Sequence, residues 1–180
     1  MNITEHFKTP IWDESKPEFL SSLDKASDKY IKQAKDRNKK HIKKFGDFGL
    51  SHHSTPLLQD NDFKDFKDYV GQKSWEYLDH QGFDMQHYTA MFSEMWVQEF
   101  SKKGGGHPRT GARATKLKIK SDNTMFNGTE LIHFIPKPGG LLIFPGYLEH
   151  EFAVDFGKEP LRFIHWNIQA VPKEMTKVGI

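Results

Sequence analysis

The sequence contains no cysteine, and this absence removes several kinds of site. Disulfide bonds, thiolate metal centres and cysteine nucleophiles are all excluded. A metal bound by this chain must therefore be held by histidine, aspartate or glutamate, a set of ligands that suits iron, manganese or zinc.

Long apolar runs and an excess of charge of one sign are also missing. No apolar run approaches the roughly 20 residues that a membrane span needs, and the start, MNITEHFKTP, lacks the apolar core of a signal peptide. The formal net charge of +2 is too small to indicate nucleic-acid binding. From these absences we expect a soluble, cytoplasmic protein without a membrane or nucleic-acid partner.

Aromatic residues are abundant, with 15 Phe, 4 Trp and 5 Tyr among the 180 residues. Large rings bury much area per residue and suit the core of a β-sandwich or barrel. The length is enough for one domain with a sizeable core, so we expect a single domain over residues 1–180.

Apolar residues recur at helical spacing in two segments of the first half of the chain. These segments, Lys16–Arg37 and Asp62–Gln81, predict two amphipathic helices in a helical N-terminal part, residues 1–87. Gly82 is well placed to end the second helix.

The stretch from Lys35 to Lys44, KDRNKKHIKK, is strongly basic. It is either a phosphate-binding patch or a solvated helix end, where cations also suit the helix dipole. The second interpretation needs no ligand and is preferred. Glycine, serine and proline mark Gly46–Gln59 as a loop, so we expect the adjacent His52 and His53 to lie at the surface or in a turn.

From residue 88 onward the pattern changes to short aromatic and β-branched segments separated by turn signals. The predicted strands are Tyr88–Phe100, Thr115–Lys120, Leu131–Pro136, Gly140–Phe144, Glu151–Phe156 and Leu161–Val171. Helices followed by a run of strands predict a barrel or jelly roll. We therefore expect a mainly β fold, with a jelly-roll core over residues 88–172 and the two helices packed on it.

Two residues near the end of the chain are candidates for a site. His150 follows a tight Pro145-Gly146 turn and enters a strand; histidine is a common metal ligand, although a lone histidine more often has a structural role. Arg162 shares the apolar face of its strand with Ile164 and Trp166, where burial requires a carboxylate partner. That partner is either a protein Asp or Glu, or a ligand.

A third candidate is His107, which follows the glycine run Gly104–Gly106. Glycines allow a close approach of the backbone to a ligand. The run is a weak phosphate-binding signal, because no helix clearly follows and the GK[ST] ending is absent. His107 remains a candidate metal ligand, restricted to extended conformations by Pro108.

The segment Met95–His107, MWVQEFSKKGGGH, and the tail PGGLLIFPGYLEHEFAVDFGKEPLRFIHWNIQAVP resemble the iron(II)/2-oxoglutarate-dependent oxygenases, most closely the small oxygenases common in bacteriophage genomes. The resemblance implies a double-stranded β-helix of eight core strands and a hydroxylation coupled to decarboxylation of 2-oxoglutarate. It implies Fe(II), 2-oxoglutarate and, as an auxiliary reductant, ascorbate. By this resemblance His150 is the distal iron ligand, Arg162 binds the far carboxylate of 2-oxoglutarate, and His107 is a second candidate ligand. The substrate is a small molecule or a protein, and the expected location is the cytoplasm, that of the host for a phage protein.

The chain departs from that family in its middle. It contains no His-x-Asp or His-x-His pair, and the glycine run meets Pro108 where the family has further strands. The simplest account is an internal deletion at about His107-Pro108, on the order of 30 residues, removing one hairpin and its loop. We therefore expect an incomplete iron site and an exposed sheet edge near Tyr88–Phe100 or Thr115–Lys120, which invites a homo-oligomer.

Two other functions stay open. One is a non-catalytic jelly-roll module that keeps the fold without the metal, which the missing ligand pair favours. The other is a cupin-like metal protein, because a glycine-rich strand, a Pro-Gly turn and a histidine also occur in the second cupin motif. The usual asparagine after that histidine is absent, and Val154 stands four places after His150.

Overall fold

The computed structural model of the protein describes residues 10–47, 50–101, 114–119, 130–134, 137–146, 149–153 and 161–176, with the backbone alone for 114–119, 130–134 and 149–153. The described helices are α1 (Leu20–Arg37), α2 (Lys39–Phe45) and α3 (Lys64–His80), and the short 3-10 turns η1 (Pro17–Phe19) and η2 (Asn61–Phe63) lead into α1 and α3. The described strands are β1 (Trp12–Ser15), β2 (Ser51–His53), β3 (Tyr88–Phe100), β4 (Ala114–Ile119), β5 (Glu130–Phe134), β6 (Gly140–Ile143), β7 (Glu149–Ala153) and β8 (Leu161–Pro172).

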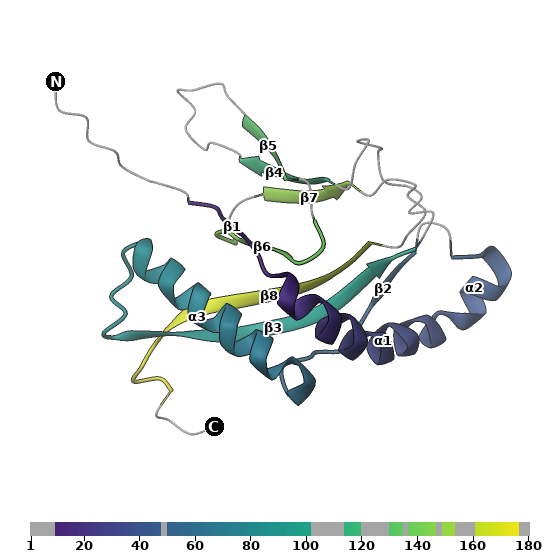
Figure 1. Ribbon diagram of the computed structural model, residues 1–180, viewed down its shortest axis with the longest axis horizontal. Helices are drawn as coiled ribbons and strands as arrows, with labels where there is room; N and C mark the ends of the chain where they lie inside the picture. The colour runs from purple at the N-terminus through teal and green to yellow at the C-terminus, as the bar shows by residue number, and fades with distance from the viewer. Residues whose placement is uncertain are drawn as a thin grey trace.

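These strands form three antiparallel sheets. β3 lies between β2 and β8, and it pairs with β8 from Tyr88–Pro172 at one end to Phe100–Leu161 at the other. β4 lies between β5 and β7, and β1 pairs with β6. In Figure 1, β1 and β6 lie between β8 and the sheet of β4, β5 and β7. Among the described strands, no pairing closes these sheets into a barrel.

Helices α1 and α3 pack against β3 and β8 (Figure 1). Successive side chains of a strand point to opposite faces, so Met95 and Val97 of β3 both point toward the helices. Both are fully buried there. Trp166 of β8 meets Phe66 of α3 edge to face, with ring centroids 5.8 Å apart. Ile31 of α1 joins the same buried cluster. Removal of this apolar surface from water is what holds the helices on the sheet.

Most predicted elements are present, with ends shifted by a few residues. The two predicted helices correspond to η1 with α1 and to η2 with α3, and the six strands predicted after residue 87 correspond to β3 through β8. The expectation of a mainly β fold needs correction, because helices are as prominent as strands in the described part of the chain. That part combines helices with antiparallel sheets. No helix in it is long and apolar enough to cross a membrane.

The sequence does not predict α2 or β2, and the unpredicted β2 leads to an error. β2 turns His52 inward, where it is fully buried, and leaves His53 exposed, because neighbours in a strand point to opposite faces. The surface position expected for both histidines is therefore wrong for His52. The exposed edge expected at Tyr88–Phe100 or Thr115–Lys120 is absent from β4, which pairs with β5 and β7 on its two sides. β3 pairs with β8 along its length but with β2 only from Gln98 to Phe100, so among the described strands the rest of β3 has a partner on one side.

Candidate functional site

Arg162 lies in β8 on the face that the helices cover. The alternation of the strand places it on the same side as Ile164 and Trp166, as the sequence predicts, and its neighbour across the sheet is Glu99 of β3. Glu99 is only 2% exposed. A carboxylate buried to this degree needs charged partners and hydrogen bonds.

The guanidinium of Arg162 donates hydrogen bonds to three protein carboxylates. Its Nε and Nη2 donate to Oε2 of Glu99 at 2.9 and 2.7 Å. Its Nη1 donates to Oδ1 of Asp24 at 2.6 Å, to the backbone oxygen of Asp24 at 3.1 Å, and to Oδ1 of Asp28 at 2.9 Å. Every guanidinium nitrogen is thus engaged within the chain, and the carboxylate partner that the sequence leaves open is here a protein glutamate.

Lys35 of α1 completes this group of charges. Its Nζ donates to Oε1 of Glu99 at 2.6 Å. Burial acts to raise the pKa of Glu99, but the hydrogen bonds from Lys35 and Arg162 outweigh it, so this pKa lies below the ordinary value of a glutamate. The hydrogen bonds of this group, hereafter the Arg162 cluster, join α1, β3 and β8; its members are Asp24, Asp28, Lys35, Glu99 and Arg162.

His52 lies opposite Glu99 in the pairing of β2 with β3. It is fully buried, and neither ring nitrogen has a hydrogen-bond partner among the residues the structure describes. Burial first, and then the charge of Lys35, lower the pKa of His52, so its neutral form is favoured. The one sequence signal for this position was that adjacent histidines must face opposite ways if their segment is a strand.

Of the two predicted iron ligands, the structure describes only the backbone of His150. His150 lies in β7, and its backbone is paired with that of Leu117 in β4. His107 lies outside the described residues. Within the described part of the chain, no group of three metal-binding side chains is found. The structure thus supplies a strand position for His150, and its relation to His107 and Arg162 as a metal site stays a prediction.

Aromatic side chains occupy the opposite face of β3 and β8. The ring of Trp96 stacks on His165 at a centroid distance of 4.0 Å and lies 4.8 Å from the ring of His53. His165 Nε2 lies 3.2 Å from Oδ1 of Asn167. These contacts hold the ring of His165 against the sheet.

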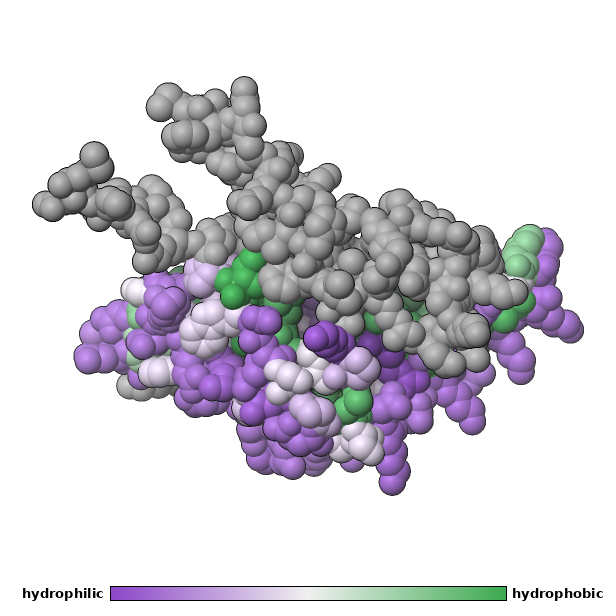
Figure 2. Space-filling model, turned by 45° about the horizontal axis from the view of Figure 1, so that its top comes forward, coloured by the Kyte–Doolittle hydropathy of each residue, from purple (hydrophilic) through white to green (hydrophobic). Residues whose placement is uncertain are grey.

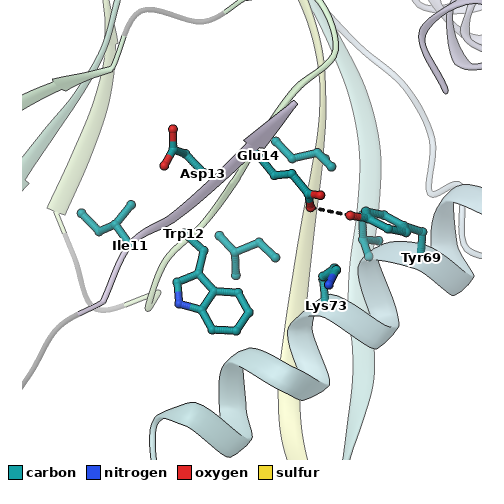
Figure 3. A pocket seen from close by; sticks show the side chains of 9 residues that line it. Ile11, Trp12, Asp13, Glu14, Tyr69 and Lys73 are labelled. Atoms are coloured by element: carbon teal, nitrogen blue, oxygen red, sulfur yellow. Dashed lines mark hydrogen bonds between the residues drawn. The ribbon is translucent and has the colours of Figure 1, made fainter. Parts of the chain in front are cut away.

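A cavity of about 360 Å³ lies between β1, β6 and α3, away from Arg162. Figure 3 shows Trp12 and Glu14 of β1 directed toward α3, where Tyr69 hydrogen bonds to Glu14. Glu14 also pairs with Lys16 at 3.2 Å, and the lining residue Lys73 pairs with Glu76 at 2.8 Å. Glu14 and Lys73 are therefore neutralised by neighbours, and the third charged lining residue, Asp13, is directed away from α3 in Figure 3, so we assign the cavity no ligand.

Comparison with known proteins adds no assignment. No protein-family model matches the chain, and none of the curated proteins matches it significantly.

Proposed function

We propose that this chain is a shortened member of the iron(II)/2-oxoglutarate oxygenase superfamily, built on an incomplete jelly-roll core. A jelly roll has eight strands in two antiparallel sheets. Its chain can be drawn as one long hairpin, in which the first strand pairs with the last, the second with the seventh, the third with the sixth and the fourth with the fifth. Removal of the second and third strands would leave the first and fourth pairs intact and would deprive the sixth and seventh strands of a partner.

The observed pairing supports this proposal. β3 and β8 pair as the first and last strands should, and β4 and β5 pair as the innermost hairpin should. β7 lies beside β4, and β6 pairs with β1, a strand from outside the proposed core. The hairpin would be missing between β3 and β4, the region where the sequence lacks the expected His-x-Asp or His-x-His strand. The strand pairing is the observation that carries the assignment.

An oxygenase reaction is the first candidate activity. When bound, iron and 2-oxoglutarate would supply the oxidising chemistry, with His150 as an iron ligand and Arg162 as the partner of the co-substrate carboxylate. The described side chains do not fit that co-substrate: Arg162 already binds Glu99, Asp24 and Asp28. A further carboxylate would have to displace one of them. We therefore derive no catalytic step through these groups.

A non-catalytic module is the second candidate, and the Arg162 cluster favours it. The residue that resembles a co-substrate ligand is here part of the contact between β8 and α1, where it neutralises a buried glutamate. Taken with the missing ligand pair in the sequence, this favours a chain that keeps the core of the superfamily as a binding or structural module. We adopt this as the proposed function of the chain. A cupin-like metal protein has no support from the described residues.

Iron and co-substrate binding distinguish the candidates. The purified full chain is titrated with iron(II) and 2-oxoglutarate without oxygen, and the visible charge-transfer absorption of the complex is recorded. Succinate is then measured after admission of air. The module is expected to show no band, no succinate and no stoichiometric iron. A band that His150→Ala abolishes and the exposed-site control His87→Ala retains would overturn the module and establish the oxygenase.

A further inference from the structure

Positive charge is concentrated on and just before helix α2, although the net charge of the whole chain is small. Residues 35–44 hold six Lys or Arg side chains and one Asp, a net charge of +5, whereas the whole chain is +2, so the remainder is −3. The structure places most of this charge on α2, a helix that the sequence does not predict. Figure 1 shows α2 at one end of the molecule, beyond the end of α1.

The lysines of α2 are not neutralised by neighbours. Lys39, Lys40, Lys43 and Lys44 are all exposed, and none forms an ion pair with another residue in the described ranges. The cations just before them differ: Lys35 pairs with Glu99, and Arg37 donates to the backbone oxygen of His53 at 2.6 Å. The four lysines therefore form a patch of uncompensated charge.

The charged and apolar residues of α2 lie on opposite faces. At 3.6 residues per turn, the four lysines fall within an arc of about 140°, and His41, Ile42 and Phe45 fall on the other side. Phe45 is 63% exposed, and its ring lies 4.9 Å from that of His41. No residue of α2 is buried. In Figure 2 a hydrophobic surface stands beside strongly hydrophilic surface at this end of the molecule. Among the described residues, none buries this apolar face: Phe45 is exposed and Ile42 is half-buried.

We propose that α2 is a docking helix for an anionic membrane surface. Phe45 and Ile42 would enter the boundary between headgroups and acyl chains, while Lys39 and Lys44, at the flanks of the apolar face, would contact anionic headgroups. A short helix with a basic face and an exposed aromatic residue on the other face has the character of interfacial helices. This inference is independent of the proposed function.

The separation of the two faces favours a membrane over nucleic acid. Single-stranded nucleic acid is bound where aromatic and basic side chains share one surface, so that bases stack while phosphates are neutralised. On α2 only Lys44 lies close to the aromatic ring, with its Nζ 4.8 Å from the ring centroid of Phe45. The other three lysines lie about 120° or more from Phe45 around the helix axis, so a polyanion that contacted them would leave Phe45 in water. A bilayer interface accommodates both kinds of side chain at once. Each lysine near an anionic membrane surface adds to the free energy of binding, and dissolved salt should screen and weaken this electrostatic attraction.

Vesicle flotation with the full chain tests the proposal. We expect binding to phosphatidylcholine vesicles that contain 30% phosphatidylserine, much weaker binding to phosphatidylcholine alone, and a loss of binding at high salt. K39Q/K44Q should weaken partitioning about 30-fold, and Phe45→Ser about tenfold or more. The matched control K25Q/K32Q removes two exposed lysines of α1 and should leave binding within a factor of about two, since these lie outside the α2 patch.

Two results would overturn the proposal. One is equal loss of vesicle binding for K39Q/K44Q and K25Q/K32Q, which would mean that only overall charge matters. The other concerns fluorescently labelled single-stranded and duplex oligonucleotides: tight binding that K39Q/K44Q weakens and Phe45→Ser leaves unchanged, with no flotation on anionic vesicles, would assign the patch to nucleic acid. Circular dichroism of each variant confirms that the fold is retained.

Discussion

Arg162 and Glu99 face each other across β8 and β3, and one oxygen of the buried Glu99 carboxylate accepts hydrogen bonds from two nitrogens of Arg162. The other oxygen accepts from Lys35 of α1 at 2.6 Å. A single side chain thus joins a helix to two strands. Because its charge lies where water does not reach, its partners are needed for stability, whatever the protein binds.

Replacement of Glu99 by glutamine should destabilise the protein. The variant keeps the size of the side chain but removes the charge that neutralises Arg162 and Lys35. Loss of one partner from a buried pair costs about 3–5 kcal/mol, and we expect about 3 here because Arg162 keeps Asp24 and Asp28. Urea unfolding measures the loss. Asp28→Asn is the control: its side chain is 68% exposed, so the cost should stay below about 1 kcal/mol.

Removal of both charges should restore most of that stability. In the double variant Glu99→Leu with Arg162→Met, no buried charge is left without a partner, and apolar groups fill the space beside α1. Such replacements are often neutral or stabilising. We expect a free energy of unfolding within about 1 kcal/mol of the wild type, again by urea unfolding. If the double variant is as unstable as Glu99→Gln, Glu99 and Arg162 do not act as a pair.

The pH dependence of stability should carry a contribution from His52. Its pKa is lowered in the folded state, first by burial and then by Lys35, so the unfolded chain binds a proton more readily. The stabilisation is therefore complete above the unfolded pKa, about 6.5, and is lost as the pH falls below it. Glu99 and Asp47 act in the opposite direction on this group but do not reverse the shift.

His52→Leu should remove this pH dependence between pH 7 and 5. It should also stabilise the protein by about 1 kcal/mol at pH 7, because it replaces a buried polar ring without hydrogen bonds in the described structure. Thermal unfolding across this pH range is the measurement. An unchanged slope in His52→Leu would show that His52 is not the group responsible.

Much of the fold follows from local patterns in the sequence. The alternation of Leu161–Val171 assigns Arg162, Ile164 and Trp166 to one face, and the structure agrees. Helical spacing locates α1 and α3, and Gly82, with φ of 90°, follows the end of α3 as expected. These features depend on neighbours in the chain, which is why the sequence alone predicts them.

The partners of the candidate site depend on tertiary contacts and could not be predicted. Glu99 and Arg162 are 63 residues apart, and Asp24 is 138 residues from Arg162. Whether Arg162 meets a glutamate or a ligand is decided by where α1 packs. The inward position of His52 likewise depends on β2, whose three residues carry too little pattern to be recognised.

Gly139 should tolerate no side chain. Its φ of 78° is in the left-handed region, and a Cβ atom there would lie 2.8 Å from Cα and 2.9 Å from N of Pro17. The same residue accepts a hydrogen bond from the backbone of Lys16 at 2.7 Å, which holds the start of η1 against the turn before β6. Gly139→Ala must therefore move backbone against backbone, and we expect a loss of about 3 kcal/mol or more in urea unfolding.

Gly46→Ala separates the two causes of that loss. Gly46 has nearly the same φ, 77°, but a Cβ atom there would meet nothing within 4 Å. Its replacement should cost only the backbone strain of an L-residue at φ 77° and ψ −178°, a region that essentially glycine alone occupies, about 1–3 kcal/mol. The difference between the two variants then measures the close approach of Gly139 to Pro17. Equal losses would mean that η1 can move away from residue 139 without a cost in stability. The contact between η1 and the turn before β6 would then not fix the position of β1, the strand that directly precedes η1.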